Sequence, residues 1–394
     1  MVVRSIPTIC IALLASLLLI DKLSADDPPR TRVRFATFNG SLNRPTSGRL
    51  VQDLNTPNNH QAQQIAEIIQ RVRPDVLLLN EFDYDEQGLA ADRFVNNYLA
   101  IAQGKQTPIR FDYKYLAPVN TGVPSGHDLD NDGNNDGPGD AFGFGVFPGQ
   151  YGMLVLSRFP IKEEAVRTFQ KFLWRDMPNA LLPHTESKPF YDEAETAILR
   201  LSSKSHWDLP IQVAGRTIHL LCAHPTPPVF DGPEDRNGRR NHDEIRFWAD
   251  YVVPDRSGYI YDDIKQKDGL PSDSAFVIAG DMNSDPFDGD STNGAIDQLL
   301  SHPLIDSRLA PASKGATEKS MHDGAANRTQ LGPPAQDTSD FNDRSVGNLR
   351  LDYVLPCKSL RVLEAGVFWP ADGESGHELV EASDHRLTWI DIEM

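Results

Sequence analysis

The chain has 394 residues, of which 39% are hydrophobic and 24% are charged. It is long enough to bury a full core and exceeds the usual span of one simple domain, so one large layered domain and two smaller ones both remain open. The formal net charge of −18 argues against tight, sequence-independent binding of duplex nucleic acid. It does not exclude a nuclease, because bound metal and a local basic patch can offset the repulsion at one site.

The first 25 residues are typical of a secretory signal peptide. Arg4 precedes an apolar run over residues 9–20, and the small residues Ser24 and Ala25 stand before Asp26. The run is shorter than the roughly 20 residues that span a bilayer. We therefore expect residues 1–25 to be cleaved and the mature chain to be secreted or periplasmic, without a transmembrane segment. A retained anchor is the alternative.

The hydrophobic pattern predicts strands interleaved with fewer helices. Residues 60–73 form the first helix, with Ile65, Ile69 and Val72 at helical spacing and Pro74 closing it. Residues 76–79 are a continuous apolar run, typical of a strand covered on both faces. Further helices are expected at 89–102 and 239–251, and further strands at 33–38, 152–157, 196–201, 217–223, 276–279, 350–355 and 387–392. This pattern favours an α/β sandwich over a strictly alternating barrel.

Between these elements lie long irregular inserts at residues 119–150, 169–191, 254–273 and 310–348. Loops of this length are usually functional or disordered. The mature chain keeps Cys222 and Cys357, which permits at most one disulfide. Both cysteines stand in apolar, strand-like runs, so we expect two buried free thiols.

Seven short polar signatures occur at the ends of the predicted strands, where an α/β scaffold exposes side chains to a cleft. They are Phe38-Asn39, Asn80-Glu81, Tyr151-Gly152, Ala223-His224, Gly280-Asp281-Met282-Asn283, Leu351-Asp352-Tyr353 and Ser383-Asp384-His385. In this order they resemble the endonuclease/exonuclease/phosphatase superfamily, which includes pancreatic-type deoxyribonucleases, apurinic endonucleases, inositol polyphosphate phosphatases and neutral sphingomyelinases. The resemblance runs from about Arg32 to the C-terminus.

The resemblance implies one domain over residues 29–394, with the inserts as loops. Its fold class is α/β (α+β), a four-layer α/β/β/α sandwich of two packed mixed sheets flanked by helices. The implied activity is that of a metal-dependent phosphoric ester hydrolase, in which activated water attacks a phosphodiester or phosphomonoester. The substrate would be a nucleic acid, a phospholipid headgroup or a small organic phosphate.

Phosphoester hydrolysis needs a cation for the phosphate oxygens and a base for the water. Oxygen ligands suit Mg²⁺ or Mn²⁺, and the resemblance implies Glu81, Asn39 and Asp384 as the ligands of the catalytic metal. The simpler interpretation of Glu81 and Asn39 is that they cap strand ends. By resemblance, Asp281 and Asn283 orient the water and hold a phosphate oxygen, while an Asx turn is the structural alternative.

His385 is the candidate general base, because its ordinary pKa lies near neutrality and a carboxylate partner, Asp352, would fix its tautomer. Some members of the superfamily are argued to use the aspartate corresponding to Asp281 instead, and the sequence leaves this open. By resemblance His224 is a phosphate-oxygen ligand or general acid, oriented by Glu195. Tyr151 could donate its hydroxyl to the phosphate, or it could be a rim aromatic.

Residues 128–136 have alternate carboxylates and a glycine at the turn, like the first half of a calcium-binding loop. The predicted ligands of a structural Ca²⁺ are Asp128, Asp130, Asp132 and Asp136. Gly139 occupies the position of the usual loop-closing Glu, so Asp136 or Asp140 would have to complete the coordination. The alternative is a solvated acidic loop.

Three arginines, at positions 236, 239 and 240, open the predicted helix that follows His224. Helix N-termini and arginine forks bind phosphate, but pairing with Asp235, Asp243 or Glu244 is equally open. Altogether the sequence predicts a secreted, monomeric phosphoesterase. The alternative is a non-catalytic, calcium-stabilised extracellular binding protein that retains the fold, although such a module has no need of the His385–Asp352 pair.

Overall fold

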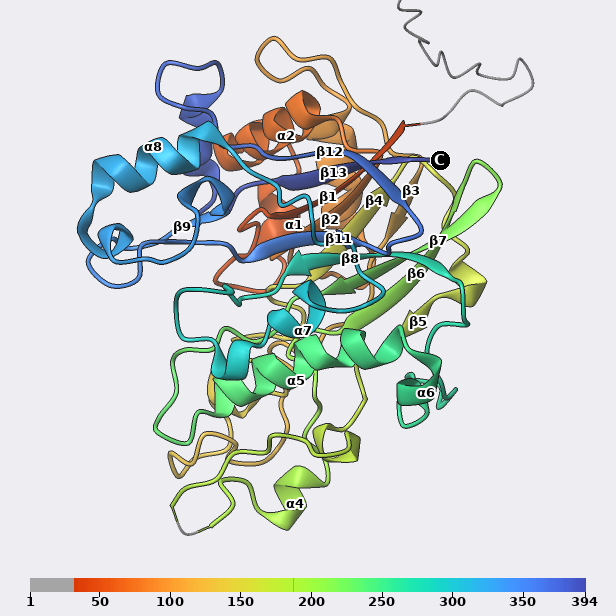
Figure 1. Ribbon diagram of the computed structural model, residues 1–394, viewed down its shortest axis with the longest axis vertical. Coiled ribbons are helices and arrows are strands. Elements are labelled where there is room, and N and C mark those ends of the chain that lie inside the picture. Colours follow the sequence, from red (N-terminus) through yellow and green to blue (C-terminus); the bar gives the residue numbers. More distant parts are fainter. Residues whose placement is uncertain (1–31, 187) are drawn as a thin grey trace, which may run out of the picture.

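The computed structural model describes residues 32–186 and 188–394, so the predicted signal peptide lies outside the described residues. Two large sheets form the centre of the molecule (Figure 1). The first has the order β12 (Arg361–Val367), β13 (Thr388–Glu393), β1 (Arg32–Asn39), β2 (Val76–Asn80), β4 (Met153–Ser157) and β3 (Tyr113–Tyr115). The second has the order β11 (Asp352–Pro356), β8 (Ala275–Asp281), β7 (Arg216–Ala223), β6 (His206–Val213) and β5 (Arg167–Thr168). Both are mixed, because β1 and β2 run parallel, as do β7 and β8, while their other neighbours are antiparallel.

The first sheet is covered on both faces, as its alternating residues show. Val33 and Phe35 of β1 belong to the core shared with the second sheet, whereas Ala36 and Phe38 belong to the core beneath the first helices. Strand β2 alternates in the same way, which explains why its sequence is apolar throughout. Helices on the outside of each sheet complete the predicted four-layer sandwich.

Helix α2 (His60–Val72) covers the outer face of the first sheet, together with α1 (Arg49–Asp53) and α3 (Leu89–Phe94). The side chain of Asn59 caps the start of α2, and Arg73 ends it with a left-handed backbone just before Pro74. Helix α3 continues as a π-helical turn, Val95–Leu99, which ends slightly before the predicted boundary.

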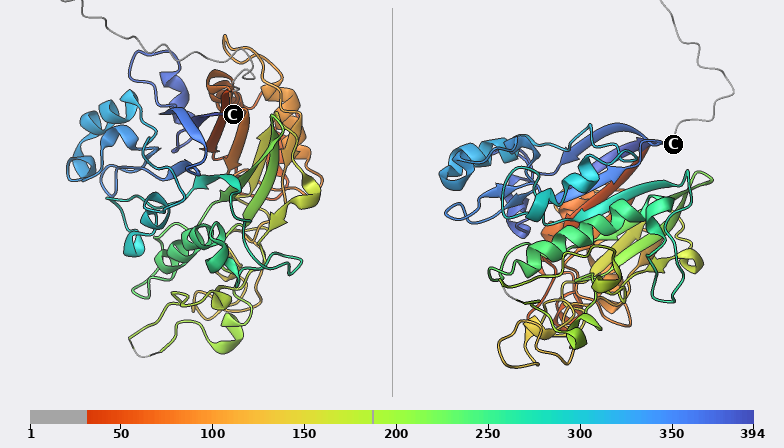
Figure 2. Two further views of the ribbon diagram at one scale, coloured as in Figure 1. Left: turned by 45° about the vertical axis from the view of Figure 1, so that its right-hand side comes forward. Right: turned by 60° about the horizontal axis from the view of Figure 1, so that its bottom comes forward.

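Helix α5 (Arg236–Tyr251) lies along the second sheet, and the two views of Figure 2 show it beside the green and yellow strands. Its Phe247 packs edge-on against Phe169 and Phe172, with ring centroids 5.0 and 5.4 Å apart. The insert beginning at residue 169 thus anchors this helix. Shorter helices follow in the loops: α4 (Glu193–Thr196), α6 (Pro254–Ser257), α7 (Asp297–Leu300) and α8 (Lys314–Asp323).

The insert at residues 310–348 is more ordered than predicted. It carries α8 and two short paired strands, β9 (Ser339–Asp340) and β10 (Asn348–Leu349), and projects to the side of the sheets (Figure 1). Cys222 and Cys357 are buried free thiols, as predicted. Within the described residues, no helix combines the length and hydropathy needed to cross a bilayer.

The predicted strand at 196–201 is wrong. Asp192 and Glu195 form a capping box that turns this segment into helix α4, and the apolar side chains Leu199 and Leu201 fill the core from an irregular loop. The neighbouring strand β6 was missed, because Pro210 interrupts its pattern. That proline is tolerated because only its carbonyl is used at this edge, where it accepts the N–H of Lys162 at 2.9 Å, while β5 pairs only with Trp207 and Asp208.

Candidate active site

The polar signatures meet at one end of the two sheets. Asn39 ends β1 in register with Asn80 at the end of the parallel strand β2, so Glu81 follows at the same edge. In the second sheet Asp281 ends β8 directly opposite Asp352, the first residue of the antiparallel strand β11. Residues that are far apart in sequence are therefore brought together by strand direction alone.

The carboxylate of Asp281 is the centre of this group. Its Oδ2 accepts a hydrogen bond from Nδ2 of Asn39 at 3.1 Å and lies 3.4 Å from Nε2 of His224 and 3.6 Å from Nε2 of His385. Its Oδ1 accepts the backbone N–H of Asn283 at 3.0 Å. All five residues are buried, and burial raises the pKa of Asp281. The carboxylate thus joins side chains supplied by both sheets.

His385 lies between two carboxylates. Its Nδ1 is 2.8 Å from Oδ2 of Asp352, and its Nε2 faces Asp281. Burial by itself would lower the pKa of His385, but Asp352 and Asp281 outweigh burial and raise it. Thr338, which the sequence did not single out, donates its hydroxyl to the same Asp352 oxygen at 2.8 Å. The predicted His385–Asp352 pair is therefore present and oriented.

Glu81 and Asn39 lie side by side at the edge of the first sheet. Glu81 is half-buried and has a left-handed backbone, with φ of 58°, which is uncommon for a residue with a side chain. Its Oε2 accepts a hydrogen bond from Nδ2 of Asn43 at 2.7 Å, and burial raises its pKa. Asp384 is exposed, and its Oδ1 accepts the hydroxyl of Ser41 at 3.2 Å. Ser41 is two residues after Asn39 in the chain, so its hydrogen bond holds Asp384 near Asn39 at the edge of the first sheet.

The predicted pairing of Glu195 with His224 is wrong. Glu195 accepts the backbone N–H of Asp192 at 2.7 Å within the capping box of α4, a helix at the lower edge of the molecule in Figure 1. Nδ1 of His224 is buried and has no hydrogen-bond partner among the described residues. Burial, followed by the nearby cations Lys204 and His385, lowers the pKa of His224 well below its usual range.

Tyr151 is positioned by a buried carboxylate that the sequence did not single out. Its backbone has φ of 55°, and its N–H donates to Oδ1 of Asp83 at 3.1 Å. The other oxygen of Asp83 accepts the N–H of Arg44 at 2.7 Å. Burial raises the pKa of Asp83 to about 7. The pKa of Tyr151 is raised by burial and then by the carboxylates of Glu81 and Asp83.

The acidic loop gathers three carboxylates, although not the four predicted. Ligand oxygens of Asp128, Asp130 and Asp140 lie within 4.8 Å of one another. Asp132 and Asp136 are outside this group. The backbone turns so that Asp132 accepts the N–H of Asn134 at 2.8 Å, while the buried Asp140 enters from the end of the loop. The set is thus completed by Asp140, the second of the two closing residues considered.

The arginines at the start of α5 are engaged within the fold. Arg236 pairs with Glu234, and Arg239 lies 3.8 Å from Asp235. Arg240 donates to the backbone carbonyls of Leu201 at 2.8 Å and Arg200 at 2.9 Å. These contacts support pairing within the protein rather than a phosphate-binding cluster.

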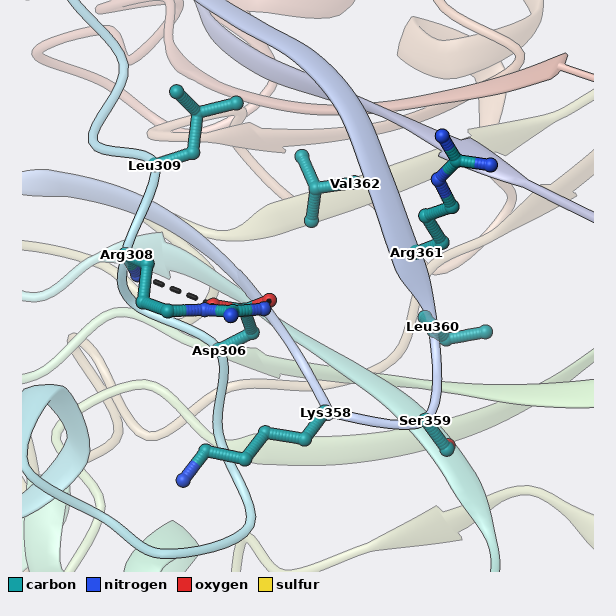
Figure 3. Close-up of a pocket in the computed structure, with 8 residues that line it drawn as sticks. All are labelled: Asp306, Arg308, Leu309, Lys358, Ser359, Leu360, Arg361 and Val362. Atoms are coloured by element: carbon teal, nitrogen blue, oxygen red, sulfur yellow. Dashed lines mark hydrogen bonds and ion pairs between the residues drawn. The ribbon is translucent and has the colours of Figure 1, made fainter. Parts of the chain in front are cut away.

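A surface pocket of about 550 Å³ lies elsewhere on the molecule (Figure 3). It is lined by Asp306, Arg308, Leu309, Lys358, Ser359, Leu360, Arg361 and Val362. Asp306 pairs with Arg308 at 2.7 Å. Residues 358–362 follow the end of β11, whereas Asp352 at its start belongs to the polar group, so the pocket is at the opposite end of that strand.

Comparison with known proteins identifies the fold. The sequence model of the Endonuclease/Exonuclease/phosphatase family matches residues 36–385. The endonuclease/exonuclease/phosphatase of Beutenbergia cavernae DSM 12333 has a similar structure, with 17% identity and a TM-score of 0.52 over 92% of this chain and 72% of that one. Sphingomyelinase C from Streptomyces griseocarneus is 15% identical, with a TM-score of 0.47 over 92% of this chain and 99% of that one. A search of curated proteins gave no match. The chain belongs to the endonuclease/exonuclease/phosphatase family, whose members are generally metal-dependent hydrolases.

Proposed function

We propose that this protein is a secreted phosphoesterase that uses Mg²⁺ or Mn²⁺ to hydrolyse phosphodiesters by attack of water. One observation carries the proposal: Asp281 is buried between Asn39, His224 and His385, and His385 is held by Asp352. A binding module gains nothing from burying two carboxylates against two imidazoles, since buried charges are costly unless they are paired. Such an arrangement is typical of proton transfer.

The residues fit a divalent cation. Glu81 is a half-buried carboxylate whose pKa is raised by burial, and a cation would offset the cost of keeping it ionised. Glu81, Asn39 and Asp384 offer oxygen atoms only, the donor set that Mg²⁺ and Mn²⁺ prefer. A bound cation would polarise the phosphate and favour ionisation of the attacking water.

The surrounding side chains have distinct roles in this mechanism. Both ring nitrogens of His385 face carboxylates, which favours the doubly protonated imidazolium, so His385 stabilises the negative charge that develops on the phosphate. Asp281 is made more basic by burial and accepts the proton of the attacking water. Asn283 holds its backbone N–H against Asp281 at 3.0 Å and so orients that carboxylate. To His224 and Tyr151 we assign the contacts with the phosphate and the leaving group.

We also propose that Asp128, Asp130 and Asp140 hold a structural Ca²⁺. Carboxylate oxygens within 4.8 Å of one another are suited to a cation with several oxygen ligands. This loop belongs to the insert that leads into Tyr151, so calcium would rigidify the approach to the site. It is separate from the catalytic metal.

Hydrolysis of a substrate panel tests the proposed activity. The panel contains bis-p-nitrophenyl phosphate, p-nitrophenyl phosphate, plasmid DNA and sphingomyelin, each with Mg²⁺, Mn²⁺, Ca²⁺ or chelator. We expect metal-dependent turnover of the diesters, lost in His385→Ala. Faster turnover of the monoester would correct the substrate class, and no turnover of any substrate with any metal would contradict the proposal in favour of a binding role.

A further inference from the structure

Lys204 is a buried cation that the catalytic group described above does not use. It lies two residues before β6, and the residue as a whole is only 6% exposed to solvent. No hydrogen bond or ion pair within the described part of the chain reaches its Nζ. Lysine is almost never buried without a partner, because an unpaired buried charge is costly. The position of Lys204 is therefore more consistent with binding an anion than with a purely structural role.

The segment that carries Lys204 is fixed from two sides. The buried carboxylate of Glu244 in α5 accepts the backbone N–H of Ser203 at 2.6 Å and that of Thr226 at 2.6 Å. Buried Asn120, from the long insert, donates its backbone N–H to the carbonyl of Lys204 at 2.8 Å and its side chain to the carbonyl of Ser202 at 2.7 Å. The backbone at Lys204 and at the two residues before it is therefore pre-organised, which is the requirement for a binding group.

The backbone places Lys204 beside the catalytic group, because the hydroxyl of Ser203 donates to the carbonyl of His224 at 3.3 Å and β6 begins with His206 opposite Ala223. Burial lowers the pKa of Lys204, while Glu244, Glu81 and Asp281 oppose this change. Among the charged groups, Lys204 has the larger effect in lowering the pKa of His224, ahead of His385. Glu244 is already occupied by two backbone N–H groups. Lys204 therefore lies next to His224 in the fold, and the carboxylates of Glu81 and Asp281 act on its charge.

We propose that the ammonium of Lys204 binds a non-bridging oxygen of the phosphoryl group, next to His224. The inference rests on the proposed function and adds one residue to it. A phosphate anion supplies the missing partner, and the ammonium supplies positive charge that the arginines of α5 cannot, because those are engaged within the fold. The interaction strengthens as negative charge builds up on the phosphoryl oxygens, so it contributes to turnover as well as to binding.

The test compares wild type with Lys204→Met, which keeps an unbranched side chain one atom shorter and removes the charge. With bis-p-nitrophenyl phosphate and saturating metal, we expect kcat/KM to fall by roughly 100-fold or more, with most of the loss in kcat. Inorganic phosphate, titrated by calorimetry, should bind at least about tenfold more weakly, which corresponds to one lost charged contact. Lys105→Met, at an exposed lysine, is the matched control and should behave as wild type.

Two further variants separate charge from packing. Propylamine should restore part of the activity of Lys204→Ala, because the small amine can occupy the space of the missing side chain, and it should not rescue Glu81→Gln. Lys204→Gln, which keeps a polar donor without charge, replaces the methionine variant if that variant does not fold. Circular dichroism and the Tm establish that each variant is folded, and the Tm of Lys204→Met should equal or exceed that of wild type, since a buried charge is removed.

The outcomes distinguish this proposal from the proposed function. Metal-dependent hydrolysis by wild type with kcat/KM unchanged in Lys204→Met would overturn the role of Lys204 and leave the phosphoesterase intact. If Lys204→Met bound metal more tightly and phosphate equally well, the lysine would be a counter-charge for the carboxylates, and the proposal would again be overturned. If wild type hydrolyses nothing, the phosphate titration decides: weaker binding in Lys204→Met supports the contact and equal binding rejects it.

Discussion

At the scale of single residues, the site depends on carboxylates in different surroundings, and Glu81, directly after β2, is only half-buried. Replacing it by Gln keeps its shape and its acceptor for Asn43 but removes the charge that a cation needs. We expect kcat/KM to fall by more than about 100-fold, since even outer-shell partners of a metal are worth about 10–100-fold. The Tm should change by less than about 4 °C.

The matched control for this change is Glu86→Gln, an exposed glutamate in the same loop, which should retain wild-type activity. Isothermal titration with Mn²⁺ provides a second readout, in which Glu81→Gln should lose the binding that wild type and Glu86→Gln share. Activity retained by Glu81→Gln would remove this residue from the metal site.

The role of His385 can be read from the pH dependence of kcat. Asp352 and Asp281 raise the pKa of His385 against the effect of burial, so Asp352→Asn should lower it. If His385 acts as the protonated, charge-stabilising group, activity is lost as pH rises through its pKa, and the alkaline limb of the profile should move to lower pH in Asp352→Asn. If His385 is instead the general base, it must be neutral to act. The acid limb of the pH profile would then move to lower pH in Asp352→Asn, and at acid pH the variant would keep a larger fraction of its maximal activity than wild type.

Most members of the catalytic group could be predicted from the sequence. Each is a polar residue at the end of an apolar run, and such runs mark the strands whose ends form the site. Asn39, Asp281, Asp352 and His385 meet as expected. The supporting residues were not predictable in this way. Thr338 and Asp83 lie in irregular segments whose contacts depend on the folded loops. The apolar pattern after Glu195 predicts a strand, but the capping box formed by Asp192 and Glu195 starts a helix there instead.

At the scale of elements, α5 does more than cover the second sheet. The two oxygens of its Glu244 each accept a backbone N–H, one from the segment before β6 and one from the segment after β7. A glutamine has only one side-chain oxygen, so it can accept only one of these two N–H groups. Its NH₂ group would face the other N–H, and two donors repel each other. We expect Glu244→Gln to lower the free energy of unfolding by about 2–3 kcal/mol, measured by urea denaturation.

The same change should reduce kcat/KM by roughly 10–100-fold, because Ser203 and Thr226 flank Lys204 and His224. Glu164→Gln, at an exposed glutamate in a short turn, is the control and should stay within about 0.5 kcal/mol of wild type. A stability loss for Glu244→Gln no larger than that of the control would mean that the two backbone bonds are not important for the fold.

Element prediction succeeded where hydrophobic periodicity was long and failed where tertiary contacts overrode it. Helix α2 and strands β1, β2 and β8 agree with their apolar patterns within a residue or two. Strand β6 was missed because Pro210 and Asp208 break its pattern, yet Asp208 is paired with His219 at 2.6 Å across β7 and is thereby satisfied. Missing β6 also concealed Lys204, whose position becomes meaningful only when that strand is placed beside β7.

At the scale of the whole molecule, the site is built across the two sheets. Asn39 comes from the first sheet and Asp281 from the second, and the core between the sheets contains Phe35 of β1 and Ile278 of β8. Composition and charge could indicate none of this. The length of the chain is sufficient for two packed sheets. The order of the layers could be predicted only through the family resemblance, because sheet pairing is set by contacts between distant segments.

The acidic loop offers a prediction about global stability. Calcium that binds the folded protein adds RT ln(1 + [Ca²⁺]/Kd) to its stability, which is about 2.7 kcal/mol when calcium exceeds Kd by 100-fold. We expect calcium to raise the Tm of wild type by several degrees relative to chelator. Asp130→Ala should lose this increase, because Asp130 contributes one of the three neighbouring carboxylates. Asp136→Ala, in the same loop but outside that group, should keep it. Calcium bound at the catalytic site would raise the Tm of all three proteins equally, so the difference between the two variants isolates the loop, and an equal rise in both would reject the structural calcium site.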